Sequence, residues 1–147
     1  MIMKNFFQYL QEAIITTKGN LGISREKMPQ IQKKDIQEFL DSLEQKGIKV
    51  RKLKMQINKL KPVQKEVNFA RVKEKLKQPQ TKPFIVSNDN YIIDGTHQYI
   101  ALSIKDPYTI VKVYKVNLPI RELLKRALKF KKVGFKNIQG KEIKKDK

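Results

Sequence analysis

The chain has 147 residues, 39% of them hydrophobic, with a formal net charge of +19, so it is long enough for one core and too short for two substantial domains. It has no cysteine and one histidine, which excludes disulfides, thiol catalysis and zinc sites made of thiolates or several histidines. No apolar run approaches the length of a membrane span and no signal peptide is recognisable, so we expect a cytoplasmic protein without membrane contact.

The N-terminal 1–50 segment is predicted to be a helical extension. Apolar residues recur at helical spacing in Met3 to Lys18. A second helix is expected from about Lys34 to Lys46, with Ile36, Phe39, Leu40 and Leu43 on one face and Gly47 as its stop. These apolar faces either cover the following domain or meet another subunit or partner protein, and the sequence leaves both alternatives open.

The stretch from Lys46 to Lys61 has the period of a half-buried strand. Leu53, Met55 and Ile57 alternate with Lys52, Lys54 and Gln56, which predicts one apolar and one cationic face. This strand opens the domain that we assign to residues 51–130. A helix is expected next, from about Val67 to Lys77.

The stretch from Lys82 to Leu102 carries the features most typical of a binding site. Two apolar runs, 84–86 and 91–93, flank the turn residues 88–90 and predict a β-hairpin. Asp94-Gly95 ends the second strand, and Thr96 is positioned to cap a helix from His97 to Ile104. A strand, a glycine turn and a helix N-terminus form a site for phosphate or another anion.

The rest of the chain predicts a strand from Ile110 to Val116 and, after Phe130, a mobile basic tail over residues 131–147. The excess of 33 Lys plus Arg over 14 Asp plus Glu favours a polyanionic partner, and we expect duplex DNA bound with little sequence preference. Phe130 and Phe135 are candidates for base stacking, whereas Tyr114 is expected in the core. The residues expected to contact nucleic acid are Lys49, Arg51, Lys52, Lys54, Lys131, Lys132 and Lys136.

The order of these segments resembles the ParB/sulfiredoxin superfamily over roughly Gln56 to Phe130. Pro62-Val63-Gln64 stands where that superfamily has Pro-x-Gln, and the stretch from Ile85 to His97 fits its I-V-x5-I-x-D-G-x-H pattern. Met28-Pro29-Gln30-Ile31 also stands as in short phage-encoded relatives. The resemblance implies an α/β (α+β) domain with a small mixed sheet. It further implies a nucleotide or phosphate pocket, for ATP, ADP or CTP with Mg²⁺, formed by Gln64, Gly95, Thr96, His97 and Gln98.

The chain departs from that superfamily at two chemically important positions. Gln98 replaces the usual arginine after the histidine, so a carboxamide stands where a guanidinium grips phosphate in two places. The turn also lacks the cysteine of sulfiredoxins. The resemblance implies a phage- or plasmid-type accessory protein that binds nucleic acid.

The sequence is also compatible with two alternative functions. The first is an enzyme, a kinase of small hydroxyl substrates or a nuclease, with Glu66 as general base, Asp94 as Mg²⁺ ligand and His97 also in the catalytic site. The second is a structural virion or packaging component with a vestigial pocket. The location would accordingly be the host cytoplasm or the virion.

Overall fold

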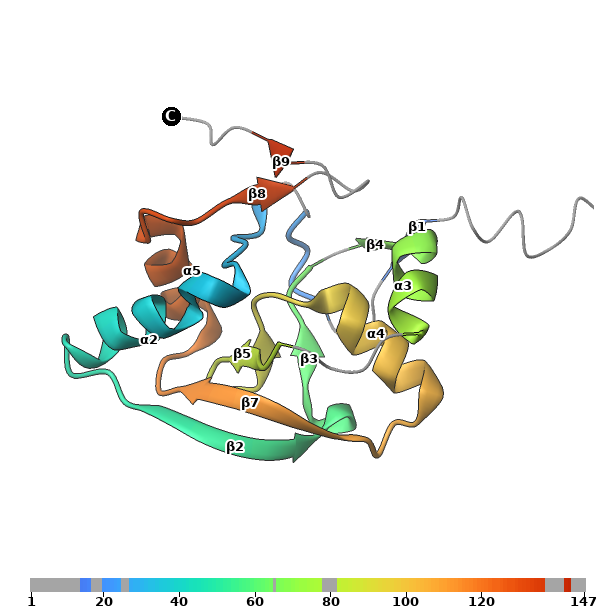
Figure 1. Cartoon of the computed structure of the whole chain (residues 1–147), viewed down its shortest axis with the longest axis horizontal. Coiled ribbons are helices and arrows are strands. Elements are labelled where there is room, and N and C mark those ends of the chain that lie inside the picture. The colour runs from blue at the N-terminus through green and yellow to red at the C-terminus, as the bar shows by residue number, and fades with distance from the viewer. Residues whose placement is uncertain are drawn as a thin grey trace, which may run out of the picture.

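An open, five-stranded mixed sheet with helices on both faces organises the chain (Figure 1). The computed structural model describes residues 14–16, 20–24, 27–64, 66–77, 82–136 and 142–143. Within these residues four α-helices and two short 3-10 turns accompany the sheet. The predicted α/β fold with a mixed sheet is therefore confirmed.

The sheet combines local and crossover connections. Its order is β2 (Val50–Gln56), β7 (Ile110–Val116), β5 (Phe84–Val86), β6 (Tyr91–Ile92) and β3 (Lys61–Pro62). β2 pairs antiparallel with β7 and β5 pairs antiparallel with β6, while β5 with β7 and β3 with β6 are parallel. The predicted hairpin and the predicted strand at 110–116 are both confirmed.

Each face of the sheet is covered by different helices. α2 (Ile36–Glu44), after the 3-10 turn η2 (Lys33–Asp35), packs with α5 (Ile120–Lys129) on a core that includes Ile85 and Val116. α4 (Thr96–Lys105) and the 3-10 turn η3 (Ile57–Lys59) pack on the other face, against Phe84 and Val86. The alternating side chains of β5 thus belong to two cores. α3 (Phe69–Leu76) lies beside α4 (Figure 1).

The N-terminal expectations have mixed outcomes. The second helix is confirmed, and its predicted apolar face is buried in the core, so this part of the extension covers the domain. The prediction of a helix over residues 3–18 is wrong for β1 (Ile14–Thr16). These residues form a strand that pairs antiparallel with β4 (Glu66–Asn68). Its β-branched residues favour an extended backbone. The remainder of that prediction lies outside the described residues.

Two C-terminal segments also differ from the expectations. α5 was not predicted from the sequence. The prediction of a mobile tail is wrong for residues 131–136. Gln30 and Gly134 exchange two backbone hydrogen bonds of 2.8 and 2.9 Å, and Phe135 is buried. β8 (Phe135–Lys136) then pairs antiparallel with β9 (Glu142–Ile143). Because Phe130 is also buried, both aromatic candidates for base stacking are core residues.

Candidate functional site

The backbone conformation of the turn after β6 determines where α4 begins. Gly95 is the N-cap of the helix, with φ of 83°, and no side chain caps the helix there. Asp94 accepts the Gly95 amide through Oδ1 at 2.7 Å. The predicted capping by Thr96 is therefore wrong, because the left-handed glycine occupies the cap and Thr96 is the first helical residue. The amides of a first helical turn have no acceptor within the helix, so this end carries donors and partial positive charge.

The Asp94 carboxylate fastens the turn to the segment before α2. Lys82 forms an ion pair with Asp94 Oδ2 and donates to the Ile31 carbonyl at 2.7 Å. The Ile31 amide also reaches Asp94 Oδ2, at 3.4 Å. Both oxygens of Asp94 thus have protein donors. No cluster of three or more His, Cys, Asp or Glu side chains suited to a metal occurs in the described residues.

His97 connects α4 to the start of α3. Its side chain is 4% exposed, and its Nε2 accepts the Asn68 amide at 3.2 Å, which assigns the ring proton to Nδ1 in the neutral imidazole. Asn68 in turn caps α3, because its side-chain oxygen accepts the amides of Ala70 at 2.9 Å and Arg71 at 3.4 Å. This histidine therefore positions the helix that lies beside the turn.

Replacing His97 by phenylalanine is expected to lower the free energy of unfolding by about 1 to 3 kcal/mol, because it leaves the Asn68 amide without its acceptor. Urea unfolding measures the effect. His97→Gln is the matched control, since a glutamine carbonyl can take the place of Nε2, and it should cost less. Equal stability of His97→Phe and the parent protein would contradict the structural role.

A cavity of about 180 Å³ opens beside this turn. Arg71 and Lys75 come from α3 and Lys82 from the segment before β5, so two separate parts of the chain bring three cations to it. The residues that line it are Gln30, Arg71, Lys75, Lys82, Pro83, Phe84, Asp94, Gly95, Thr96, His97 and Gln98. Sequence reasoning identified the residues 94–98 but missed Arg71 and Lys75. Their spacing of four residues, which places both on one helix face, was the available signal.

Two donors in the cavity wall lack a partner among the residues that the structure describes. Arg71 Nε and Gln98 Nε2 are buried atoms for which the described part of the chain offers no hydrogen-bond acceptor. A terminal nitrogen of Arg71 lies 3.8 Å from the Glu74 carboxylate. Buried donors without acceptors cost free energy, which a ligand or a water molecule that supplies acceptors would offset.

Two other predicted pocket residues are not among those that the described structure places at the cavity. Gln64 is 1% exposed and does not line the cavity. The backbone of Glu66 lies in β4, and its side chain lies outside the described residues. The five residues from Asp94 to Gln98 thus share the cavity with α3 instead.

The predicted nucleic-acid contacts divide among several surfaces. Lys52 and Lys54 are exposed on β2, but Arg51 points to the opposite face of that strand because side chains alternate. Lys49 is exposed just before the strand. Lys132 instead lies 2.6 Å from Glu38 and 3.8 Å from Asp35, and its hydrogen bond with Glu38 raises the pKa of its ammonium group. The side chain of Lys136 lies outside the described residues.

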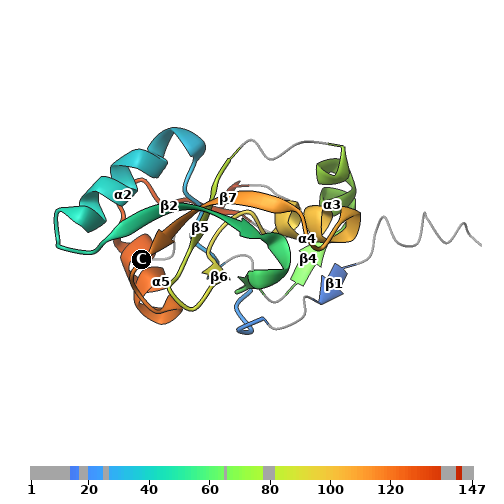
Figure 2. The same cartoon turned by 90° about the horizontal axis from the view of Figure 1, so that it is seen from below.

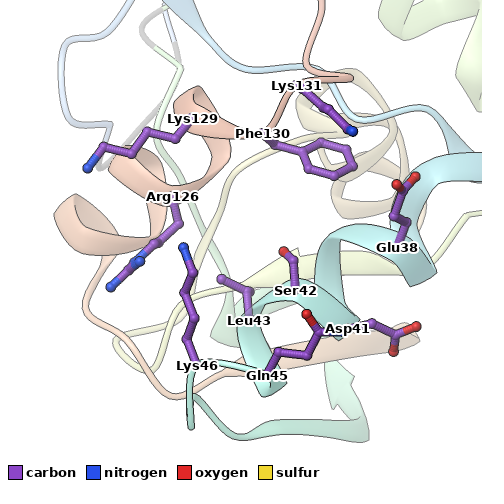
Figure 3. Close-up of a pocket in the computed structure, with 10 residues that line it drawn as sticks. All are labelled: Glu38, Asp41, Ser42, Leu43, Gln45, Lys46, Arg126, Lys129, Phe130 and Lys131. Atoms are coloured by element: carbon purple, nitrogen blue, oxygen red, sulfur yellow. The ribbon is translucent and has the colours of Figure 1, made fainter.

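Lys131 borders an open hollow of about 630 Å³ between α2 and α5 (Figure 3). Arg126 and Lys129 stand on its α5 side, whereas Glu38 and Asp41 stand on its α2 side. The mixed charge suits a polyanion poorly. The hollow therefore ranks behind the cavity beside α4 as a candidate site.

Comparison of the chain with family models, with curated proteins and with solved structures finds no match. The likeness to the ParB/sulfiredoxin superfamily accordingly rests on the motif residues alone. Within the described residues, no helix combines the length and the apolar character needed to cross a membrane.

Proposed function

We propose that the protein binds nucleic acid and holds a nucleotide phosphate in the cavity between α3 and α4. One observation carries the proposal: the buried donors Arg71 Nε and Gln98 Nε2 line the same cavity as the N-terminus of α4. Phosphate is rich in acceptors and negatively charged, and it suits both a guanidinium and helix N-terminal amides. The net charge of +19 supports the nucleic-acid part.

Arg71 answers the main objection raised by the sequence. The ParB/sulfiredoxin-like pattern has an arginine where this chain has Gln98, and a carboxamide alone grips phosphate weakly. In this chain a guanidinium comes from the adjacent helix α3 and borders the same cavity as Gln98. The phosphate fork is thus supplied by Arg71, with Gln98 as a neutral donor.

The proposal is binding without turnover. Mg²⁺ at Asp94 would compete with the Lys82 ammonium, which is already ion-paired with Oδ2, while Oδ1 accepts the Gly95 amide. His97 accepts from the Asn68 amide through the nitrogen that a general base would use. These contacts favour structural roles for both residues, and they support a nucleotide site of the accessory protein more than a kinase or a nuclease.

The replacement Arg71→Met is expected to weaken nucleotide binding by about 10- to 100-fold, the value of a hydrogen bond to a charged group. Titration of ATP, CTP, GTP and ADP, with and without Mg²⁺, measures this in calorimetry. Lys105→Met is the matched control, because it removes one exposed cation from the opposite end of α4.

Equal loss in both variants would assign the effect to net charge rather than to the cavity. Tight binding that is indifferent to Arg71→Met, or no binding of any nucleotide by the parent protein, would contradict the proposed phosphate site.

A further inference from the structure

The antiparallel pair β2 and β7 presents a cationic face. Lys52 lies opposite Tyr114 and Lys54 lies opposite Lys112 in the register, so these four side chains share one side of the sheet. Neither strand contains Asp or Glu. Leu53 and Val113 of the same strands belong to the core under α4 instead.

Helices leave this part of the sheet open. α2 and α5 pack over the end that carries Val50 and Val116, whereas Lys52, Lys54 and Lys112 are exposed. Figure 2 shows β2 and β7 crossing the molecule between the α2–α5 pair and the α3–α4 pair. A groove of about 460 Å³ lies on them, lined by both strands and by Pro83. Pro83 also lines the cavity beside α4, so the groove and the cavity adjoin.

The ammonium groups of three lysines lie close together on the face that forms the groove. Lys54 and Lys112 face each other directly across the strand pair, and like charges in that position destabilise a sheet. Lys52 Nζ lies 5.6 Å from the centre of the Tyr114 ring, which holds a third ammonium group over the same face. Three ammonium groups on one face, in strands without acidic residues, suit an anionic partner.

We propose that this groove binds the sugar-phosphate backbone of one nucleic-acid strand. The inference deepens the nucleic-acid part of the proposed function and rests on it. Residues two apart in a strand are about 6.8 Å apart, and neighbouring strands are about 4.8 Å apart. The three lysines therefore cover the phosphates of a short stretch of one strand. The paired strands of duplex DNA are separated by a groove about 12 Å wide, which such a compact cluster does not span.

The test replaces Lys52, Lys54 and Lys112 together by glutamine and measures anisotropy of a labelled oligothymidylate across a salt series. Loss of three phosphate contacts should lower the slope of log K against log salt by about 2 and the affinity at 0.1 M salt by roughly 100-fold. The matched control replaces the exposed Lys33, Lys34 and Lys105 by glutamine, which changes net charge equally. Its slope should remain within about half a unit of the parent slope.

A second variant separates binding from folding. Lys54→Glu places a carboxylate opposite Lys112, so the melting temperature should stay equal or rise while single-strand affinity falls at least tenfold. A duplex of the same length should lose less affinity than the single strand in both variants.

The outcomes distinguish the groove from the wider proposal. If the parent protein binds nucleic acid but the triple variant keeps its affinity and slope, or loses single strand and duplex alike, the groove is not the single-strand site while nucleic-acid binding stands. If the parent protein binds neither nucleic acid at low salt, both fail. Nucleotide titration of the triple variant reports separately on the cavity beside α4.

Discussion

Replacing Phe39 by alanine is expected to lower the free energy of unfolding by about 3 to 5 kcal/mol, the cost of truncating a buried aromatic ring. Phe39 is 1% exposed in α2, and its ring meets the Phe130 ring edge-on with centroids 5.3 Å apart. α2 thus joins the N-terminal segment to α5 through the core. Urea unfolding followed by circular dichroism measures the change.

The matched control for Phe39 is an exposed aromatic residue. Tyr108 is 65% exposed, so Tyr108→Ala should change the free energy of unfolding by no more than about 0.5 kcal/mol. If Phe39→Ala left the melting temperature intact but dissociated an oligomer, α2 would be an assembly surface and its packing against α5 would be overturned. The two alternatives that the sequence left open are therefore separated by one variant.

Elements whose signal lies within the segment itself could be predicted from the sequence. β2 is an example, since the alternation of Leu53 and Met55 with lysines has the period of a strand. The apolar face of α2 has the period of a helix in the same way. The sequence of α5 carries a helical signal of the same kind and was sufficient to predict this helix. Pro119 is its N-cap, and its buried face consists of Ile120, Leu123, Leu124 and Ala127.

Other features depend on partners far away in the chain. Ile14–Thr16 lie in a segment, Met3 to Lys18, whose apolar residues recur at helical spacing, yet pairing with β4 places them in a strand. The segment after Phe130 is basic, yet Gly134 pairs with Gln30 and holds its start against the core. Tertiary pairing overrode local pattern in both cases.

The candidate site likewise combines features with a local sequence signal and features that depend on distant partners. Gly95 and the helix after it were apparent from the sequence, because a glycine turn before a helix is a local pattern. The spacing of Arg71 and Lys75 marks a shared helix face, but only the packing of α3 beside α4 brings the Arg71 guanidinium to the cavity. The ion pair of Asp94 with Lys82 likewise requires the segment before β5 to pass beside the turn.

Replacing Gly95 by valine is expected to lower the free energy of unfolding by about 2 to 5 kcal/mol, through backbone strain and overpacking. The φ of Gly95 is +83°, a conformation that a β-branched residue adopts only with strain. A β-carbon there would also approach Phe84 Cε1 to 3.0 Å and Cδ1 to 3.1 Å. Phe84 is 3% exposed in the core under α4, so its ring has little room to yield.

Gly47 is the matched control, because its φ is +80° and a β-carbon there meets nothing within 4 Å. Gly47→Val thus carries the backbone strain alone, and the difference between the two variants in urea unfolding isolates the contact with Phe84. Equal costs would show that Phe84 yields and that strain is the whole effect. A Gly95→Val protein as stable as its parent would contradict the left-handed turn itself. Because the expected cost falls on folding, loss of nucleotide binding in Gly95→Val does not by itself identify a phosphate site, whereas Arg71→Met probes the ligand from a helix that keeps its cap.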